Sequence, residues 1–496
     1  MARMLQELKF KNIADFKAII TEPTLTNHIN LLSHTDDTTL IDKNNQLIRI
    51  FKLEGFSATT SSEGDLAELR ESRSQFYKDL DINVGLYFWS IRQKCSVELK
   101  GEFRQTSFTE KFNTEYQERL NQSDLFKTDH YVALVTKPNG DNKNIKRLFN
   151  TANEEAFNNF LSKQKIILND ASKRLCTNFN KYGIKTLGVV QINNKFISEP
   201  LTAMDYILNH SHFNVPRLLC AVDKVLMRNK PFFHKKKGVI ALRDINNTTK
   251  FAAILSIALY CTEPFAGMLD DLQQLPIELV ITQSFAPLYR DVARKKLKNI
   301  QDRMLQSPDE SIAQTQELSQ SMEILASSES NYGIHHFSVC VYADSEDELD
   351  NNITKIRDKA DIASLVLIRE YLGLEIAYWA QLAGNFNYIA RGADISTRNL
   401  ASFTSFHNQA RGRESKNHWG DALTVFQTGF STPFYFNIHA RDVGIGLIYG
   451  AQGSGKTVLV GSIILQSMKF GGRRVIFDKN KALRLWFLPP RARILI

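Results

Sequence analysis

The stretch Gly450-Ala451-Gln452-Gly453-Ser454-Gly455-Lys456-Thr457 fits the phosphate-binding loop pattern G-x-x-x-x-G-K-[ST] at every fixed position. Its glycines leave room for successive backbone N–H groups to face phosphate oxygens without an intervening Cβ. Lys456 is predicted to reach the β- and γ-phosphates of a nucleotide, and the Thr457 hydroxyl is predicted to ligate Mg²⁺. We therefore expect ATP with Mg²⁺ as the ligand, with all eight residues of this loop forming the nucleotide site.

The flanking sequence gives this loop the structural context that a P-loop needs. An apolar run at 444–449 predicts a strand that leads into the loop. Val460, Ile464 and Met468 recur every four residues and predict a helix after it, which Gly471-Gly472 can end. A second short strand is predicted at 474–477. A strand, loop, helix and strand in this order indicate the start of a P-loop NTPase domain, whereas a glycine-rich turn without a ligand would leave Lys456 unexplained.

Asp478 follows the second predicted strand, and two interpretations of it remain open. Lys456 would take part in catalysis by binding phosphate, and an acid beside the P-loop could do so by positioning water or metal. Asp478 fits a turn residue equally well. Hydrolysis also needs a further strand acid that holds Mg²⁺, and residues 479–496 contain no Asp or Glu. We therefore expect an incomplete NTPase domain that hydrolyses ATP weakly or not at all by itself.

The bulk composition is that of a globular protein with a mild excess of positive charge. The 496 residues suggest about three domains, and 43% hydrophobic and 23% charged residues predict ordinary folding. The formal charge of +9 favours an anionic neighbour, although a solvated surface explains it as well. Five scattered cysteines without a C-x-x-C pair indicate reduced thiols in a cytoplasm. The N-terminal residues lack a signal peptide's apolar core, and the longest apolar run, 251–261, is too short to span a bilayer.

We expect an α/β protein in three parts. Residues 1–150 predict a mixed α and β subdomain, residues 151–410 a helix-rich α/β assembly domain, and residues 411–496 the incomplete, RecA-like P-loop domain. Strands are predicted at 46–53, 83–92, 130–136, 277–283, 337–342 and 362–368, and helices at 65–80, after Tyr289, after a capping box at 307–310 and after Ser345. Residues 137–142 predict a loop at the first boundary.

Other motifs give weaker signals. His335-His336 lies at a strand start without the spaced ligands that a metal site requires, so we expect no metal there. Lys235-Lys236-Lys237 and the basic cluster Arg294-Lys295-Lys296-Lys298 fit solvated faces, with contact to an anion or a partner as the alternative.

At this point the chain resembles the ATPases of type IV secretion and conjugation systems, the VirB/TrbE/CagE family. Gly446-Leu447-Ile448-Tyr449, the P-loop and Val475-Ile476-Phe477-Asp478-Lys479 are similar to that family's motor segment, and residues 432–439 resemble the run ahead of it. Further upstream, Gln381-Leu382-Ala383-Gly384-Asn385 resembles a Leu-Pro-Gly-Asn motif in which Ala383 replaces the proline. Leu53-Glu54-Gly55 and Ile91-Arg92 also look similar to family positions.

The resemblance implies an ATPase on the cytoplasmic face of the inner membrane, attached peripherally and forming homo-oligomers when full length. Its partners would be inner-membrane and channel components of the secretion system, and nucleic acid would be contacted at most indirectly. ATP turnover would drive pilus assembly and transfer of DNA or protein. The similarity fades after Lys481, and we expect 482–496 to be a truncated or out-of-frame tail. The alternatives are a non-catalytic assembly component and a DNA translocase of the HerA/FtsK kind.

Overall fold

A large antiparallel sheet organises the protein. The computed structural model describes residues 25–101, 107–137, 154–218, 221–244, 246–305, 330–439 and 442–479, with a few single residues between 322 and 327 and at 482–483. Within these residues the main sheet has 13 strands, and ten of them follow one another in the order β1-β2-β3-β5-β4-β12-β13-β11-β10-β9. The short strands β6, β15 and β14 pair alongside β3, β13 and β11. The mixed α and β character that the sequence predicts is confirmed.

The strands of this sheet come from the whole length of the chain between residues 31 and 396. Their bounds are β1 Leu31–Asp36, β2 Thr39–Asp42, β3 Leu47–Leu53, β4 Val84–Lys94, β5 Phe126–Thr136, β6 Ile184–Thr186, β9 Lys230–His234, β10 Val239–Arg243, β11 Thr249–Leu259, β12 Leu279–Pro287, β13 Tyr332–Ala343, β14 Val366–Arg369 and β15 Ala393–Ser396. Two separate hairpins are formed by β7 Val189–Ile192 with β8 Lys195–Ser198 and by β16 Thr424–Gln427 with β17 Pro433–Phe436.

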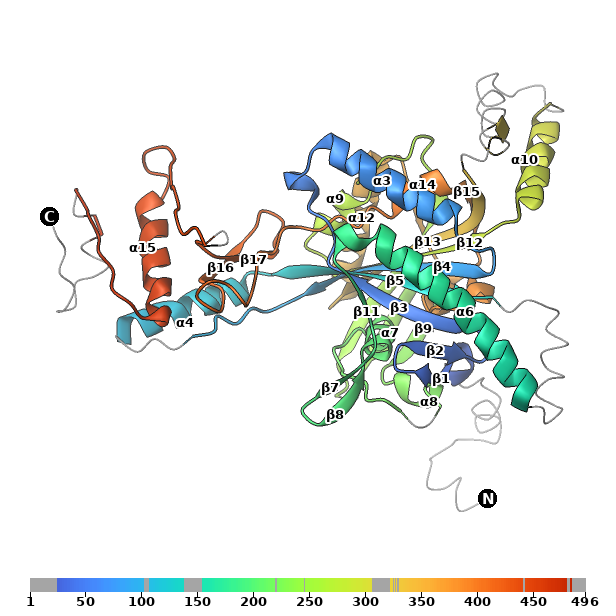
Figure 1. Cartoon of the computed structure of the whole chain (residues 1–496), viewed down its shortest axis with the longest axis horizontal. Helices are drawn as coiled ribbons and strands as arrows, with labels where there is room; N and C mark the ends of the chain where they lie inside the picture. Colours follow the sequence, from blue (N-terminus) through green and yellow to red (C-terminus); the bar gives the residue numbers. More distant parts are fainter. Residues whose placement is uncertain are drawn as a thin grey trace, which may run out of the picture.

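Helices cover both faces of the sheet (Figure 1). Their bounds are α3 Glu63–Lys78, α4 Ser107–Gln122, α6 Glu154–Asn178, α7 Glu199–Asn209, α8 Asp223–Leu226, α9 Asp270–Gln274, α10 Arg290–Leu305, α12 Glu346–Ile362, α13 Leu374–Trp379, α14 Thr397–Phe403 and α15 Lys456–Ser467. Because successive strand residues point to opposite faces, Leu86 and Phe88 of β4 pack with α3 and α6, whereas Tyr87 and Trp89 pack with α7 and α13. A strand covered on both sides is apolar throughout, which explains the unbroken apolar runs in the sequence.

Most of the predicted elements are confirmed with small shifts at their ends. β3, β4, β5, β12, β13 and β14 each overlap a predicted strand, and α3 and α10 overlap predicted helices. The Ser345 side chain caps α12 by accepting from the Glu348 N–H, as its position in the sequence predicts. The predicted capping box at 307–310 and most of the predicted loop at 137–142 lie outside the described residues, as do Cys220, the first 24 residues and most of 482–496.

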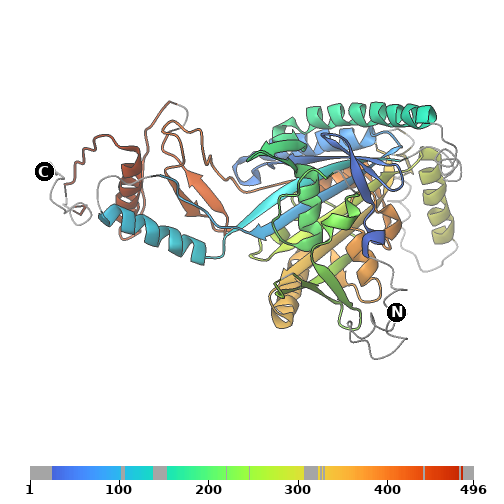
Figure 2. The same ribbon diagram turned by 90° about the horizontal axis from the view of Figure 1, so that it is seen from below.

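Strands β4 and β5 continue beyond the sheet as a paired arm that carries a smaller lobe. They stay in register from Val84↔Thr136 to Lys94↔Phe126, and their outer ends reach the lobe (Figures 1 and 2). We call the described residues of 95–125 and 412–479 the P-loop lobe and the rest the body. Val97, Leu99, Leu120 and Leu125 form a small core in this lobe with Val425 of β16.

Candidate functional site

The P-loop lies at the start of α15, on the surface of the P-loop lobe. Gly453 and Gly455 have φ angles of +80° and +82°, a region that side chains with a Cβ adopt at a cost. Gly455 is the residue before the helix, and its carbonyl accepts the Leu459 N–H over 3.0 Å. The predicted helix is therefore confirmed. It begins at Lys456, so its positive N-terminal end faces the loop, as a phosphate site requires.

The Lys456 ammonium closes the loop on itself. Its Nζ donates to the carbonyls of Gly450 and Ala451 over 2.9 and 2.6 Å, and it lies 3.5 Å from the Ser454 hydroxyl. The Thr457 side chain is exposed in the first turn of α15. The loop thus presents backbone N–H groups, an ammonium and a hydroxyl on one accessible surface, and this donor set fits a nucleotide phosphate with a magnesium ion.

The strands predicted on either side of this loop are wrong. Within the described part of 442–479, residues 444–449 and 474–477 are extended but form no strand ladder, with only isolated bridge positions at Val443 and Phe477. The side chains of Ile445, Leu447 and Tyr449 are more than four-fifths exposed. A segment becomes a strand only when a neighbouring strand supplies hydrogen-bond partners, and neither segment has one among the described residues.

Asp478 lies in the turn after the second extended segment. Its carboxylate accepts the backbone N–H of Leu483 over 2.7 Å, which is the bond expected of a turn residue. Whether Asp478 also serves catalysis stays a prediction.

The end of α15 is fixed to the rest of the lobe. Gly471 ends the following 3-10 turn with a φ of +71°, so the predicted stop at Gly471-Gly472 is confirmed. The Arg474 guanidinium donates to the carbonyls of Ser467 and Gly471, and it satisfies groups that the helix end leaves unpaired. Lys469 donates to the Ala422 carbonyl over 2.7 Å, and burial lowers the pKa of Lys469 to about 8. The P-loop helix is therefore held from its C-terminal end while its N-terminal end stays open.

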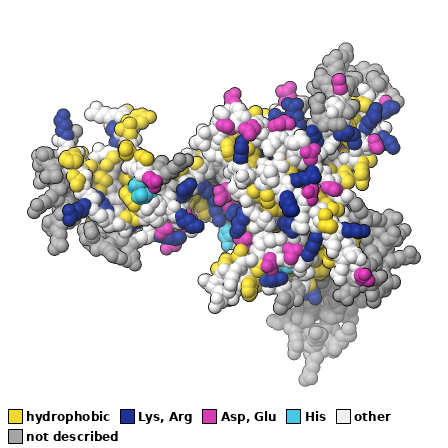
Figure 3. Space-filling model, viewed as in Figure 1, with side chains coloured by type: hydrophobic (Ala, Val, Ile, Leu, Met, Phe, Trp, Pro, Cys, Tyr) yellow, Lys and Arg dark blue, Asp and Glu magenta, His cyan; other side chains and the backbone are white. Residues whose placement is uncertain are grey.

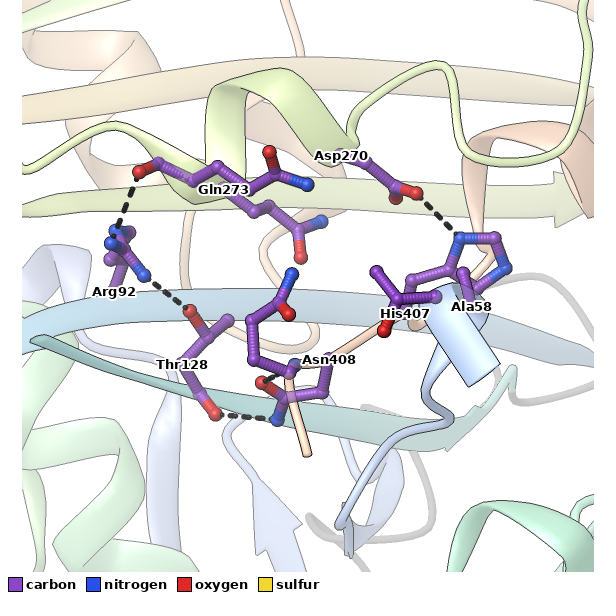
Figure 4. A pocket seen from close by; sticks show the side chains of 10 residues that line it. Ala58, Arg92, Thr128, Asp270, Gln273, His407 and Asn408 are labelled. Carbon is purple, nitrogen blue, oxygen red and sulfur yellow. Dashed lines mark hydrogen bonds and ion pairs between the residues drawn. The ribbon is translucent and has the colours of Figure 1, made fainter. Parts of the chain in front are cut away.

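A buried arginine joins the body to the P-loop lobe. The Arg92 guanidinium, on β4, donates to the carbonyls of Leu275, Gln274 and Phe430 and to the Thr128 hydroxyl. Phe430 lies in the turn between β16 and β17, so this side chain links the sheet, the end of α9 and the lobe. Burial lowers the pKa of Arg92 to about 10, which still leaves it charged at neutral pH. Figure 4 shows Arg92 on one side of a hollow and His407 with Asp270 on the other.

The chain segment that enters the lobe crosses the root of the arm beside Arg92. The Asn408 side chain donates to the carbonyls of Glu54 and Thr128 over 3.0 and 2.9 Å. His407 lies 2.7 Å from the Asp270 carboxylate (Figure 4). Arg411 donates to the Thr128 carbonyl, and its guanidinium lies 3.8 Å from Asp129. We call residues 407–412 the crossing segment.

Arg92, the crossing segment and the residues that they contact at the root of the arm form what we call the joint. Asp129 is the acid at its centre. Lys52 lies 2.9 Å from its carboxylate, and Lys127 and Arg411 each lie 3.8 Å away. Burial raises the pKa of Asp129, but the three cations outweigh burial and hold the pKa at about 2. The sequence reasoning missed this joint, because its members lie up to 359 positions apart. Lys52, Glu54 and Arg92 stood in segments that it had singled out, but nothing in those segments indicated a contact with Asp129 or Arg411.

The structure also shows where the histidine pair at 335–336 and the lysines at 235–237 lie. His335 bonds to Tyr260 and Gln283 inside the sheet, and the described residues contain no cluster of metal-binding side chains. Lys235 and Lys237 pair with Glu375 and Glu346 on the surface.

Two family models match the sequence at these structural units. The model of the CagE, TrbE, VirB family, a component of the type IV transporter system, matches residues 185–391. The model of the N-terminal domain of the type IV secretion system ATPase VirB4/TrbE matches residues 38–144, which include both strands of the arm. The chain belongs to the VirB4/TrbE family.

Curated relatives extend this family match into the P-loop lobe. The chain is 27% identical over 463 residues to the type IV secretion system protein virB4 of Bartonella henselae and 29% identical over 463 residues to protein virB4 of Agrobacterium tumefaciens strain 15955. It is 23% identical over 494 residues to the type IV secretion system protein virB4 of Brucella suis. The matches cover 92–93% of this chain and 58% of each relative, so the chain spans about three-fifths of the length of the VirB4 proteins it matches.

None of the helices among the described residues combines the length and the apolar composition that a bilayer crossing requires.

Proposed function

We propose that this chain is the ATP-binding subunit of a type IV secretion or conjugation system. The observation that carries the proposal is the P-loop at the start of α15 in a chain of the VirB4/TrbE family. The loop supplies backbone N–H groups and the Lys456 ammonium for phosphate, and Thr457 supplies a hydroxyl for Mg²⁺. The bound magnesium ion would neutralise phosphate charge.

Binding requires Lys456 to exchange partners. Its ammonium now satisfies the carbonyls of Gly450 and Ala451. A phosphate oxygen is the stronger acceptor because it is charged, so the ammonium gains a charge-assisted bond by turning toward it. The glycines at 453 and 455 keep the loop in the conformation that the phosphate needs, and α15 orients the electrostatic field of its N-terminus toward it.

The full-length protein is proposed to power pilus assembly and the transfer of DNA or protein, as a homo-oligomer bound peripherally to the inner-membrane and channel components. The body, with its large sheet, is proposed to serve the assembly contacts. Contact with nucleic acid would be indirect. The alternative of a non-catalytic assembly component makes the same body contacts without ATP turnover.

A fluorescent ATP analogue tests the nucleotide site directly. We expect saturable binding in the presence of Mg²⁺, and Lys456→Ala should weaken it at least about tenfold, because a charge-assisted bond contributes about 1.5–3 kcal/mol. Thr457→Ala should remove the dependence on Mg²⁺ and keep binding of the metal-free nucleotide. Lys111→Ala changes an exposed lysine of α4 in the same lobe and is the matched control. Equal affinities of the wild type and Lys456→Ala would contradict the proposal.

Hydrolysis separates the catalytic from the non-catalytic alternative. We expect phosphate release near the background rate, since the segment after Asp478 supplies no further acid. Turnover that depends on Lys456 would contradict this expectation and would support a catalytic site in this chain. Retained binding to channel proteins without turnover would support the assembly role.

A further inference from the structure

A cavity opens beside the arm, on the face of the sheet that α7 covers. Its walls are β3, β4 and β5 on one side and α7 with the β7–β8 hairpin on the other. Figure 1 shows the hairpin and α7 on the opposite side of the sheet from α3 and α6. The cavity measures about 270 Å³, below the roughly 300–1,000 Å³ of pockets for drug-sized ligands, so it fits one or two side chains of a partner. We call it the hairpin cavity.

One wall of the hairpin cavity is aliphatic and partly open to solvent. Val190 of β7 pairs with Ile197 of β8, and Ile192 lies two residues further along β7, so the three side chains point to the same face. Ile192 is 44% exposed. Ile91 of β4 and Tyr206 of α7 continue this surface inward and are buried. An aliphatic side chain laid against the wall would remove apolar surface of both partners from water.

The other end of the hairpin cavity carries an excess of positive charge. Asp129 faces the three cations that hold its pKa at about 2, and two of them, Lys52 and Lys127, line the cavity. Glu199, the second carboxylate in the lining, is paired with Lys185 over 2.6 Å. Among the described residues four basic groups thus face two carboxylates, which leaves an excess of two positive charges. Figure 3 shows basic and acidic side chains gathered where the arm meets the body.

Gln93 adds a requirement for a hydrogen-bond donor. This side chain lines the hairpin cavity, although only 5% of the residue is exposed. Its Nε2 donates to the Asp129 carboxylate over 3.2 Å, whereas its Oε1 accepts no hydrogen bond from any described residue. A buried acceptor without a donor costs free energy, so a ligand that brings an N–H group to Gln93 would satisfy it.

These three features together fit an acidic protein segment. A carboxylate complements the positive charge, an aliphatic side chain covers the hairpin wall, and a backbone N–H can donate to Gln93. The phosphates of a nucleic acid carry no such donor, and its bases bind by stacking on exposed aromatic rings, whereas the exposed wall here is aliphatic. We propose that the hairpin cavity binds a protein segment in which Asp or Glu adjoins a large aliphatic residue. This inference goes beyond nucleotide binding and does not depend on it.

Selection of random heptapeptides from a displayed library, on the full chain, tests the proposal. We expect the enriched peptides to carry Asp or Glu within two positions of Leu, Ile, Val or Met. The most enriched peptide, synthesised with a fluorescent label, should bind the full chain with an affinity that falls as salt rises. Failure to enrich any peptide, or enrichment of peptides without an acidic residue, would overturn the proposal.

Two variants with matched controls show whether the labelled peptide occupies the cavity. Lys127→Gln should weaken its binding about threefold, the effect of a partly exposed ion pair, whereas Lys235→Gln, at a lysine paired with an acid elsewhere on the body, should leave it unchanged. Ile192→Ala should weaken binding about fivefold through lost apolar contact, whereas Ile166→Ala, at an exposed isoleucine of α6, should not. Unchanged affinity in either cavity variant would contradict the proposal.

A competition experiment separates protein from nucleic acid as the ligand. An oligothymidine of eight nucleotides that displaces the labelled peptide at a lower concentration than the unlabelled peptide does would overturn the assignment to a protein segment. Far-ultraviolet circular dichroism checks that each variant is folded. Binding of the ATP analogue by the same samples reports on the P-loop separately, so failure of this inference and failure of the proposed function are distinguishable.

Discussion

The guanidinium of Arg92 in the body donates to the carbonyl of Phe430 in the P-loop lobe over 2.9 Å. The same side chain holds the end of α9 through Gln274 and Leu275, and it reaches β5 through Thr128. One buried cation thus satisfies acceptors from both parts of the molecule at the root of the arm. The position of the lobe relative to the sheet depends on this contact together with the crossing segment.

Replacing Arg92 by Met should therefore destabilise the joint. Met keeps the buried apolar stem but removes the donor of the Gln274 and Phe430 carbonyls, whereas the Leu275 carbonyl still accepts the Ile277 N–H. Each unsatisfied buried acceptor costs about 1–3 kcal/mol. We expect a loss of roughly 3 kcal/mol in the free energy of unfolding, measured by urea denaturation. Arg119→Met, at an exposed site on α4, should change it by less than about 0.5 kcal/mol. Similar values for the two variants would show that Arg92 does not hold the joint.

The Asp129 cluster makes a stability contribution that depends on pH in the acid range. Its pKa is held at about 2 in the folded protein, below the ordinary 3.8, so the contribution is fully present above about pH 4 and is lost as pH falls through about 2. The shift corresponds to about 2 kcal/mol. We expect the stability difference between the wild type and Asp129→Asn to shrink by about this amount between pH 4.5 and pH 2, in denaturant titrations. A difference that stays constant over this range would contradict the assignment.

His130 should produce a second pH dependence, at higher pH. Its Nε2 lies 3.0 Å from the His407 carbonyl and must donate, so Nδ1 accepts from the Ser90 hydroxyl over 2.8 Å. Burial lowers the pKa of His130 to about 4, from 6.5. The folded state therefore binds fewer protons than the unfolded state between these values, and stability falls as pH is lowered from 6.5 to 4, by up to about 1.4 kcal/mol per unit.

Comparison with His130→Asn isolates this effect. The wild type should lose stability relative to the variant as pH falls from 6.5 to 4, whereas His418→Asn, at an exposed histidine of the lobe, should follow the wild type. Parallel curves for the wild type and His130→Asn would contradict the prediction.

Gly412 should not tolerate a side chain. Its φ is +67°, and a Cβ there would lie 2.0 Å from the Tyr435 carbonyl oxygen, against which the crossing segment is bridged. Gly412→Ala should cost about 3 kcal/mol through backbone strain and displacement of β17. Limited proteolysis should then cut more rapidly near residues 408–412. Gly429→Ala is the control, because a Cβ at that position meets no atom within 4 Å; equal cleavage of both variants would count against the predicted strain.

The sequence predicted the P-loop helix and six of the 13 strands of the sheet, because these elements show clear local patterns. Lys456 to Ser467 form a helix since the loop before it and the apolar spacing within it lie in the same short segment. Residues 444–449 have the composition of a strand, but a strand also needs a neighbour, and periodicity contains no information about pairing. The contacts of the joint could not be predicted for the same reason, since nothing local to Arg92, Asp129 or Arg411 indicates that these residues meet.

The arm has a consequence for how the molecule can be divided. The chain passes between body and lobe three times, out along β4, back along β5 and out again through the crossing segment. No single cut in the polypeptide can therefore release the lobe as an intact unit. A fragment that starts after residue 410 would lack α4 and the strand ends that bury Val425, and a fragment that stops there would leave Leu99 and Leu120 without their cover. Nucleotide-site variants should accordingly be studied in the whole chain, where the small apolar core of the lobe is complete.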